Sequence, residues 1–99
     1  MIKHIVLLTW KEGVTQDQID AVTSEFCALG EEIDEIVSYQ FGQDAGIYRG
    51  NADYALVAEF RDESDLKSYV VHPGHQELLS RVTGPILESF QSVQFDFSE

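Results

Sequence analysis

The chain has 99 residues, and we expect one domain over residues 1–99. Eighteen acidic residues against six basic ones give a net charge of −12, which repels phosphate backbones and anionic lipids and argues against nucleic-acid and membrane partners. The single cysteine, Cys27, excludes an internal disulfide and a cysteine-based zinc site. The apolar run at residues 2–8 has no small-residue cleavage site after it, so we expect a cytoplasmic protein.

The first half of the chain predicts a strand and then a helix. Residues 2–10 are largely apolar at both odd and even positions, which is typical of a strand covered on both faces. Thr15 with Gln18 three residues later is the pattern of a capping box and predicts a helix start. The apolar stripe of that helix follows helical spacing through Ile19, Val22, Phe26, Leu29 and Ile33.

The second half predicts three more strands around another helical region. Residues 37–41 have strand character, and residues 54–60 alternate as a second clear strand. A helix starting near Glu63 should end at His72-Pro73, because the residue before a proline avoids the helical conformation. A further helix can begin at that proline, and residues 91–97 predict the last strand.

The order β-α-β-β-α-β predicts an α+β, ferredoxin-like fold, in which a four-stranded antiparallel sheet carries the helices on one face. Strand parity places Ile5, Leu7, Ala55 and Val57 on the other face. Left bare, that face would expose an apolar patch on the order of several hundred Å². We therefore expect a homodimer, packed sheet to sheet about a two-fold axis, with these four residues in the interface.

The histidines mark the candidate site. Two of the three lie in the stretch Tyr69 to His75, which reads YVVHPGH, and His4 is the third. An ordinary pKa of about 6.5 suits histidine to proton transfer near neutral pH. Parity places His4, Tyr54 and Tyr69 on the helix side of the sheet, with His75 at the rim of a cavity. In the structural alternative, His72 fills or caps a tight turn, His75 bonds to backbone groups at the start of a helix, and His4 is a core histidine with its hydrogen bonds satisfied.

The chain resembles the stress-responsive dimeric α/β-barrel (Dabb) proteins over essentially its whole length. The stretches that carry the resemblance are IKHIVLL at residues 2–8, DYALVAEF at residues 53–60 and YVVHPGH at residues 69–75. It implies a ferredoxin-like protomer whose sheet forms a barrel with that of its partner. The family includes stress-induced plant proteins and a plant polyketide cyclase. Similarity to that cyclase implies catalytic roles for Tyr69 and His75 and a pocket role for His4, while Tyr54 stands where the cyclase has a further pocket histidine.

Three hypotheses on function compete. The first is a homodimeric protein that binds a small apolar or phenolic molecule between sheet and helices, with His4, Tyr54 and His72 as ligand-binding residues. The second is a cofactor-independent cyclase, isomerase or monooxygenase in which Tyr69 holds a neutral His75, the general base. The third is a structural stress protein with no small-molecule site. We expect no cofactor. Metal binding is a fourth possibility that the sequence does not favour, because the three histidines lack the paired helical spacing of a zinc site. A connected cavity would favour the first two hypotheses.

Overall fold

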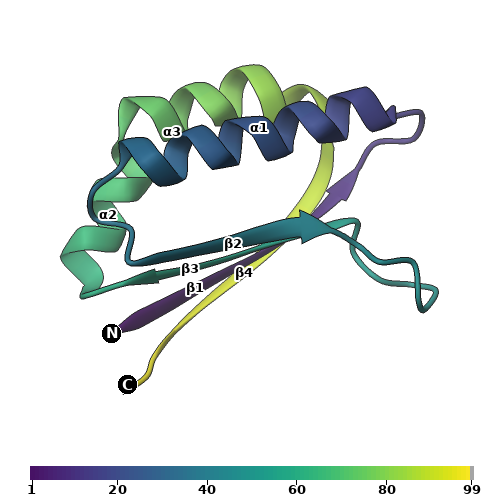
Figure 1. Ribbon diagram of the computed structural model, residues 1–99. Coiled ribbons are helices and arrows are strands. Elements are labelled where there is room, and N and C mark those ends of the chain that lie inside the picture. Colours follow the sequence, from purple (N-terminus) through teal and green to yellow (C-terminus); the bar gives the residue numbers. More distant parts are fainter. Residues whose placement is uncertain (99) are drawn as a thin grey trace.

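A four-stranded antiparallel sheet with helices on one face forms the protein (Figure 1), as seen in a computed structural model that describes residues 1–98. The strands are β1 (Ile2–Trp10), β2 (Ser38–Gln43), β3 (Tyr54–Phe60) and β4 (Leu87–Asp96), arranged in the order β2-β3-β1-β4. The helices are α1 (Gln16–Glu32), α2 (Glu63–Val71) and α3 (Pro73–Leu78), and a π-helical turn (Leu79–Thr83) and a 3-10 turn (Gly84–Ile86) continue α3. The predicted ferredoxin-like α+β fold is confirmed.

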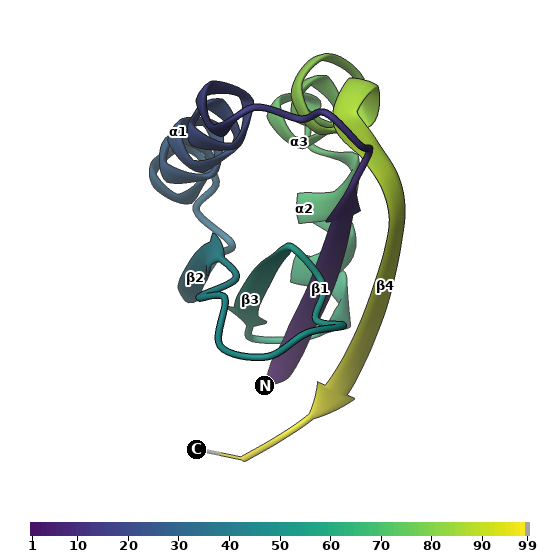
Figure 2. The same cartoon turned by 90° about the vertical axis from the view of Figure 1, so that its right-hand side faces the viewer.

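The central strand β1 pairs with β3 on one side and with β4 on the other. Ile5 lies opposite Val57 in the first ladder and opposite Val93 in the second. Figure 2 shows α1 above the β2 side of the sheet and α3 above the β4 side. The two ends of the chain lie side by side at the same end of the sheet, where the amide of Phe97 donates to the carbonyl of Met1 at 3.1 Å.

Helix α1 begins as the sequence predicts. The Thr15 hydroxyl accepts from the Gln18 amide at 3.3 Å, and the Gln18 side chain accepts from the Thr15 amide at 2.9 Å, so the capping box is complete. The predicted apolar stripe is buried against the sheet as Ile19, Val22, Phe26, Leu29 and Ile33. No helix among residues 1–98 is long and apolar enough to cross a membrane.

The boundaries after residue 60 follow the prediction at the proline and differ at the last strand. His72 ends α2 and caps α3: its Nδ1 accepts from the Gly74 amide at 3.0 Å, and Pro73 is the first helical residue. Strand β4 starts at Leu87, four residues before the predicted start. Residues 87–90 do not alternate clearly in hydrophobicity, and main-chain pairing with β1 extends this exposed edge strand.

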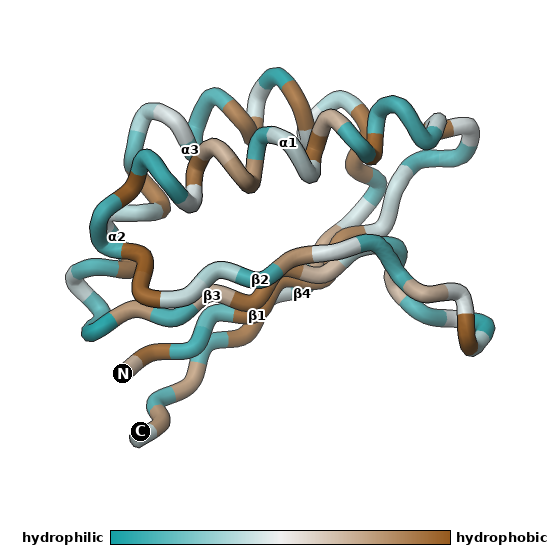
Figure 3. Tube along the Cα trace, viewed as in Figure 1, coloured by the Kyte–Doolittle hydropathy of each residue, from teal (hydrophilic) through white to brown (hydrophobic). Residues whose placement is uncertain are grey.

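The face of the sheet opposite the helices is uncovered in the protomer. The four residues expected there do share this face, since Ile5 pairs with Val57 and Leu7 with Ala55, and β4 adds Val93 and Phe95. Figure 3 shows hydrophobic residues along the strands, and it shows that the helices cover only one face of the sheet. Leu7, Val93 and Phe95 are 41%, 53% and 45% exposed, respectively.

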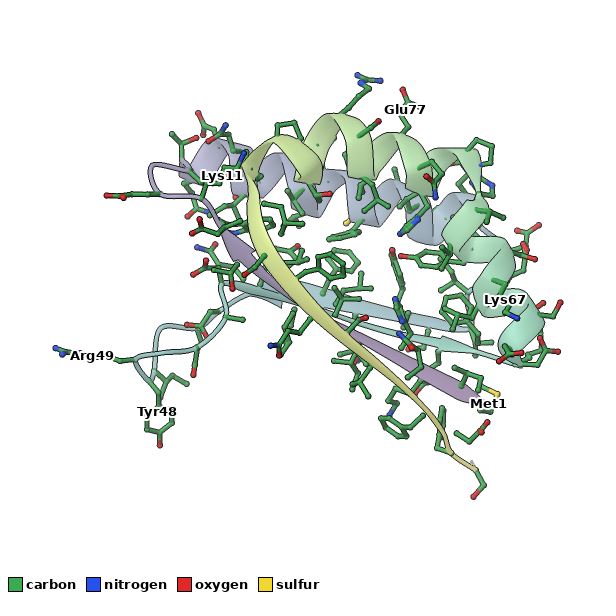
Figure 4. All side chains as sticks on the ribbon, turned by 180° about the vertical axis from the view of Figure 1, so that it is seen from behind. Met1, Lys11, Tyr48, Arg49, Lys67 and Glu77 are labelled. Atoms are coloured by element: carbon green, nitrogen blue, oxygen red, sulfur yellow. The ribbon has the colours of Figure 1, made fainter. Side chains whose placement is uncertain are left out.

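The loop between β2 and β3 extends past the sheet on the side away from the helices (Figure 4). Tyr48 and Arg49 point outward at its tip. At its base, the amide of Asp53 donates to the carbonyl of Leu8 at 2.8 Å, and the Asp53 carboxylate accepts from the Trp10 amide at 2.8 Å. This loop is therefore anchored to the end of β1.

Candidate functional site

A cavity of about 240 Å³ lies between the sheet and the region of α3 and the π-helical turn. Its walls are mostly aliphatic and aromatic, and their polar groups come from His4, Tyr69, His75, Thr83 and Ser92. None of the lining residues, all of which belong to the described part of the chain, is Asp, Glu, Lys or Arg. The cavity therefore suits a neutral, largely apolar molecule.

His75 presents a hydrogen-bond acceptor in this cavity wall. It is the third residue of α3, and its Nδ1 lies 3.0 Å from the carbonyl oxygen of Val70. Because a carbonyl can only accept, Nδ1 carries the proton, and in the neutral ring Nε2 keeps its lone pair. Burial lowers the pKa of His75, the neighbouring His72 lowers it further, and the bond to Val70 opposes these effects. At neutral pH His75 is a neutral imidazole with a free acceptor.

His4 is held in the opposite tautomer. Its Nδ1 accepts from the side-chain amide of Gln94 at 2.9 Å, so the neutral ring carries its proton on Nε2. Gln94 lies directly opposite His4 in the ladder between β1 and β4. Burial lowers the pKa of His4, and the nearby His75 lowers it further. The two imidazoles that line the cavity thus supply one donor and one acceptor.

Tyr69 contacts both imidazoles with its ring. The ring centroids are 4.5 Å apart for Tyr69 and His75 and 6.2 Å apart for Tyr69 and His4. The Tyr69 hydroxyl is hydrogen-bonded to that of Tyr39 at 2.7 Å. Burial raises the pKa of Tyr69 to about 12, and burial also raises the pKa of Tyr39, so both hydroxyls stay protonated. The hydrogen bond to Val70, rather than the predicted Tyr69, fixes the ring of His75.

The other two predicted ligand-binding residues have partners elsewhere. Tyr54 lies on the helix side of the sheet as strand parity predicts, but its hydroxyl bonds to Thr23 at 2.7 Å and its ring packs 5.8 Å from that of Trp10. It lies four residues along β3 from Ala58, the ladder partner of His4, which is about 13 Å. His72 caps α3. Neither residue lines the cavity, which brings together His4, Tyr69 and His75.

Two residues around these side chains were not identified from the sequence. Gln94 could have been found, because antiparallel pairing of β1 with β4 places a residue near position 94 opposite His4. Tyr39 is on β2, an edge strand separated from β1 by β3, so no local pattern connects it with Tyr69. The tertiary packing of β2 and α2 is needed to bring those two hydroxyls together.

Comparison with known proteins identifies relatives along the whole chain. The family model described as the stress responsive A/B barrel domain, Dabb, matches residues 2–99. The stress-response A/B barrel domain-containing protein HS1 of Arabidopsis thaliana is 24% identical over 87 residues, which cover 86% of this chain and 80% of that protein.

Solved structures show the same fold. A dimeric ferredoxin-like protein of unknown function from Thermobifida fusca is 36% identical, with a TM-score of 0.90 over 97% of this chain and 90% of that chain. The hydroxynitrile lyase from Passiflora edulis is 22% identical, with a TM-score of 0.84 over 99% of this chain and 94% of that chain.

Proposed function

The chain belongs to the Dabb family of stress-responsive A/B barrel domains, and we propose that it acts as a homodimer that binds a small phenolic or otherwise hydroxylated apolar molecule in the cavity between its sheet and helices. The observation that carries this proposal is the pair of opposite histidine tautomers in an uncharged cavity. A phenol hydroxyl can donate to Nε2 of His75 and accept from Nε2–H of His4.

The size and charge of the cavity narrow the ligand class. Its volume of about 240 Å³ is below the roughly 300–1,000 Å³ of pockets that hold drug-sized ligands. A molecule with one ring therefore fits better than a polycyclic one. The lining offers an anion no cationic side chain, and the net charge of −12 repels it, which favours a neutral ligand.

Dimerisation is supported by the uncovered sheet face and by the relatives. The exposed apolar residues on β1 and β4 would be buried by a second sheet packed on this face. The relative from Thermobifida fusca is described as dimeric. We place Ile5, Leu7, Ala55 and Val57 in the interface, together with Val93 and Phe95.

An enzymatic function is the second candidate, and the free Nε2 of His75 favours it. A neutral imidazole in a cavity can remove a proton from a carbon next to a carbonyl group, while the electron pair moves onto the carbonyl oxygen. The Nε2–H of His4 could then donate to that oxygen. Tyr69, with a pKa of about 12, would remain a neutral wall of the site rather than a base.

Titration calorimetry with 4-ethylphenol tests the proposed function. We expect binding to the wild type and about tenfold weaker binding to His75→Ala, because one hydrogen bond and a ring contact are lost. The control is His72→Asn, which removes a histidine outside the cavity and keeps a side-chain acceptor for the helix cap. Equal affinity in wild type and His75→Ala, or no binding to either, would contradict the proposal. Turnover of an enolisable ketone that disappears in His75→Ala would favour the enzyme.

A further inference from the structure

Thr83 carries a buried hydroxyl that no group in the described part of the chain satisfies. Its side chain is 2% exposed and lines the cavity, and its Oγ1 has no hydrogen-bond partner among residues 1–98. The other unpartnered buried side-chain atom in this part of the chain, Nε1 of Trp10, does not belong to the cavity wall. Most buried hydroxyls in proteins are hydrogen-bonded, so an unpartnered one in a cavity wall points to a ligand.

The backbone around Thr83 has an unusual form. Residues Leu79–Thr83 make a π-helical turn, which the amide of Gly84 closes by donating to the carbonyl of Leu79. A Cβ at residue 84 would come closer than 3.0 Å to that carbonyl oxygen, so this turn depends on glycine there. In a helix a threonine hydroxyl can bond to the carbonyl four residues earlier, and Thr83 makes no such bond. Single π-helical turns of this kind recur at functional sites.

Thr83 also lies far from the histidines along the cavity wall. It follows His75 by eight residues of helical chain, which spans about 10–12 Å. On the sheet below, the wall runs from His4 to Leu8, four residues or about 13 Å along β1. A ligand hydroxyl that contacts the histidines therefore leaves the far end of the ligand near Thr83.

We propose that the Thr83 hydroxyl is a second hydrogen-bonding point for the ligand and selects a molecule with polar groups at both ends of an apolar body. This inference rests on the proposed function, in which the cavity binds a small phenolic molecule. The ligand class becomes a para-substituted phenol or similar single-ring compound whose side chain carries a hydroxyl or carbonyl group. Thr83 is thus a specificity-determining residue.

Two isosteric probes test the proposal: 4-(2-hydroxyethyl)phenol and 4-propylphenol, which differ by a hydroxyl in place of a methyl group. The quantity measured is the ratio of their dissociation constants, by calorimetry, for the wild type and for Thr83→Val. We expect Thr83→Val to shift this ratio about tenfold toward the propyl compound, because the hydroxyl partner is lost and the side-chain shape is kept. Thr83→Ser should keep the wild-type ratio.

Thermal unfolding without ligand gives an independent measurement. If the Thr83 hydroxyl stabilised the fold, Thr83→Val would have a lower melting temperature than the wild type. Because the hydroxyl is buried without a partner in the described part of the chain, its removal should leave the melting temperature unchanged or raise it. Thr23→Val is the matched control, because it removes a threonine hydroxyl that is bonded to Tyr54 outside the cavity. Thr23→Val should leave the ratio of the two dissociation constants unchanged.

The outcomes separate the two proposals. If both probes bind and the ratio is the same in wild type and Thr83→Val, the role of Thr83 is overturned and the proposed function stands. If neither probe binds the wild type, the proposed function fails and the inference fails with it. If Thr83→Val does not fold, Thr83→Ala provides the same comparison of ratios.

Discussion

Replacing Gly84 by alanine should destabilise the protein even though the backbone at this position is an ordinary right-handed helical one, with φ −51° and ψ −49°. The added Cβ would meet the carbonyl oxygen of Leu79 at less than 3.0 Å. Relieving that overlap by moving backbone costs about 1–3 kcal/mol, and losing the hydrogen bond that closes the turn adds about 1 kcal/mol. The expected loss is therefore about 2–4 kcal/mol, a large share of the roughly 5–15 kcal/mol that stabilises a domain of this size.

Thermal and urea unfolding, followed by circular dichroism at a fixed protein concentration, would measure this loss. A loss of 2–4 kcal/mol corresponds to a melting temperature lower by roughly 10–25 °C. The control is Gly42→Ala on β2, where an added Cβ meets nothing within 4 Å in the protomer and, opposite Ala55, lies on the face that we place in the dimer interface. We expect its stability to stay within about 1 kcal/mol of the wild type. A Gly84→Ala protein as stable as Gly42→Ala would refute the argument that the π-helical turn depends on the missing side chain.

Four further predictions concern the dimer, the histidines and Gln94. Val57→Lys should place a charge in the sheet-to-sheet interface and give monomer or aggregate in light scattering; an unchanged dimer would exclude this interface. Phenol binding should weaken as the pH falls from about 6.5 through the lowered pKa of His75, because protonation of Nε2 removes the acceptor. Folding stability should fall over the same pH interval. The unfolded chain, whose histidines have ordinary pKa values, takes up protons first, because the fold holds His4 and His75 neutral. Calorimetric titrations and urea melts between pH 5 and 8 that show no decline as the pH falls would contradict the assignment of neutral histidines. Gln94→Met should free Nδ1 of His4 from its donor and weaken 4-ethylphenol binding about threefold to tenfold, whereas Gln91→Met, on the other face of β4, should not change it.

Local sequence signals predicted the elements whose boundaries depend on neighbouring residues. The capping box at Thr15 and the proline after His72 each fix a helix end through contacts within three residues, and both helix ends are where they were predicted. Strand β3 matches its predicted range because it alternates along its whole length. The start of β4 was predicted four residues late, since pairing with β1 extends it through residues that show no clear alternation.

The candidate site was only partly accessible to the same reasoning. Strand parity placed His4 and Tyr54 on the helix side of the sheet, but parity carries no information on position along the strand axis, and Tyr54 lies outside the cavity wall. The role of Thr83 depends on a π-helical turn, and no periodic pattern of side chains distinguishes that turn from an α-helix that ends at Gly84-Pro85. These features follow from tertiary packing rather than from local sequence.

The adjacency of the two chain ends has a consequence for folding kinetics. The ladder between β1 and β4 joins residues such as His4 and Gln94, which are 90 positions apart in sequence. A circularly permuted chain, with a short linker from residue 98 to Met1 and new ends at the exposed tip of the loop between β2 and β3, would turn that ladder into a local hairpin. The ladder between β2 and β3 would become long-range in exchange, but it is shorter than the ladder between β1 and β4, so the relative contact order would still fall. The permuted chain should therefore fold faster than the parent.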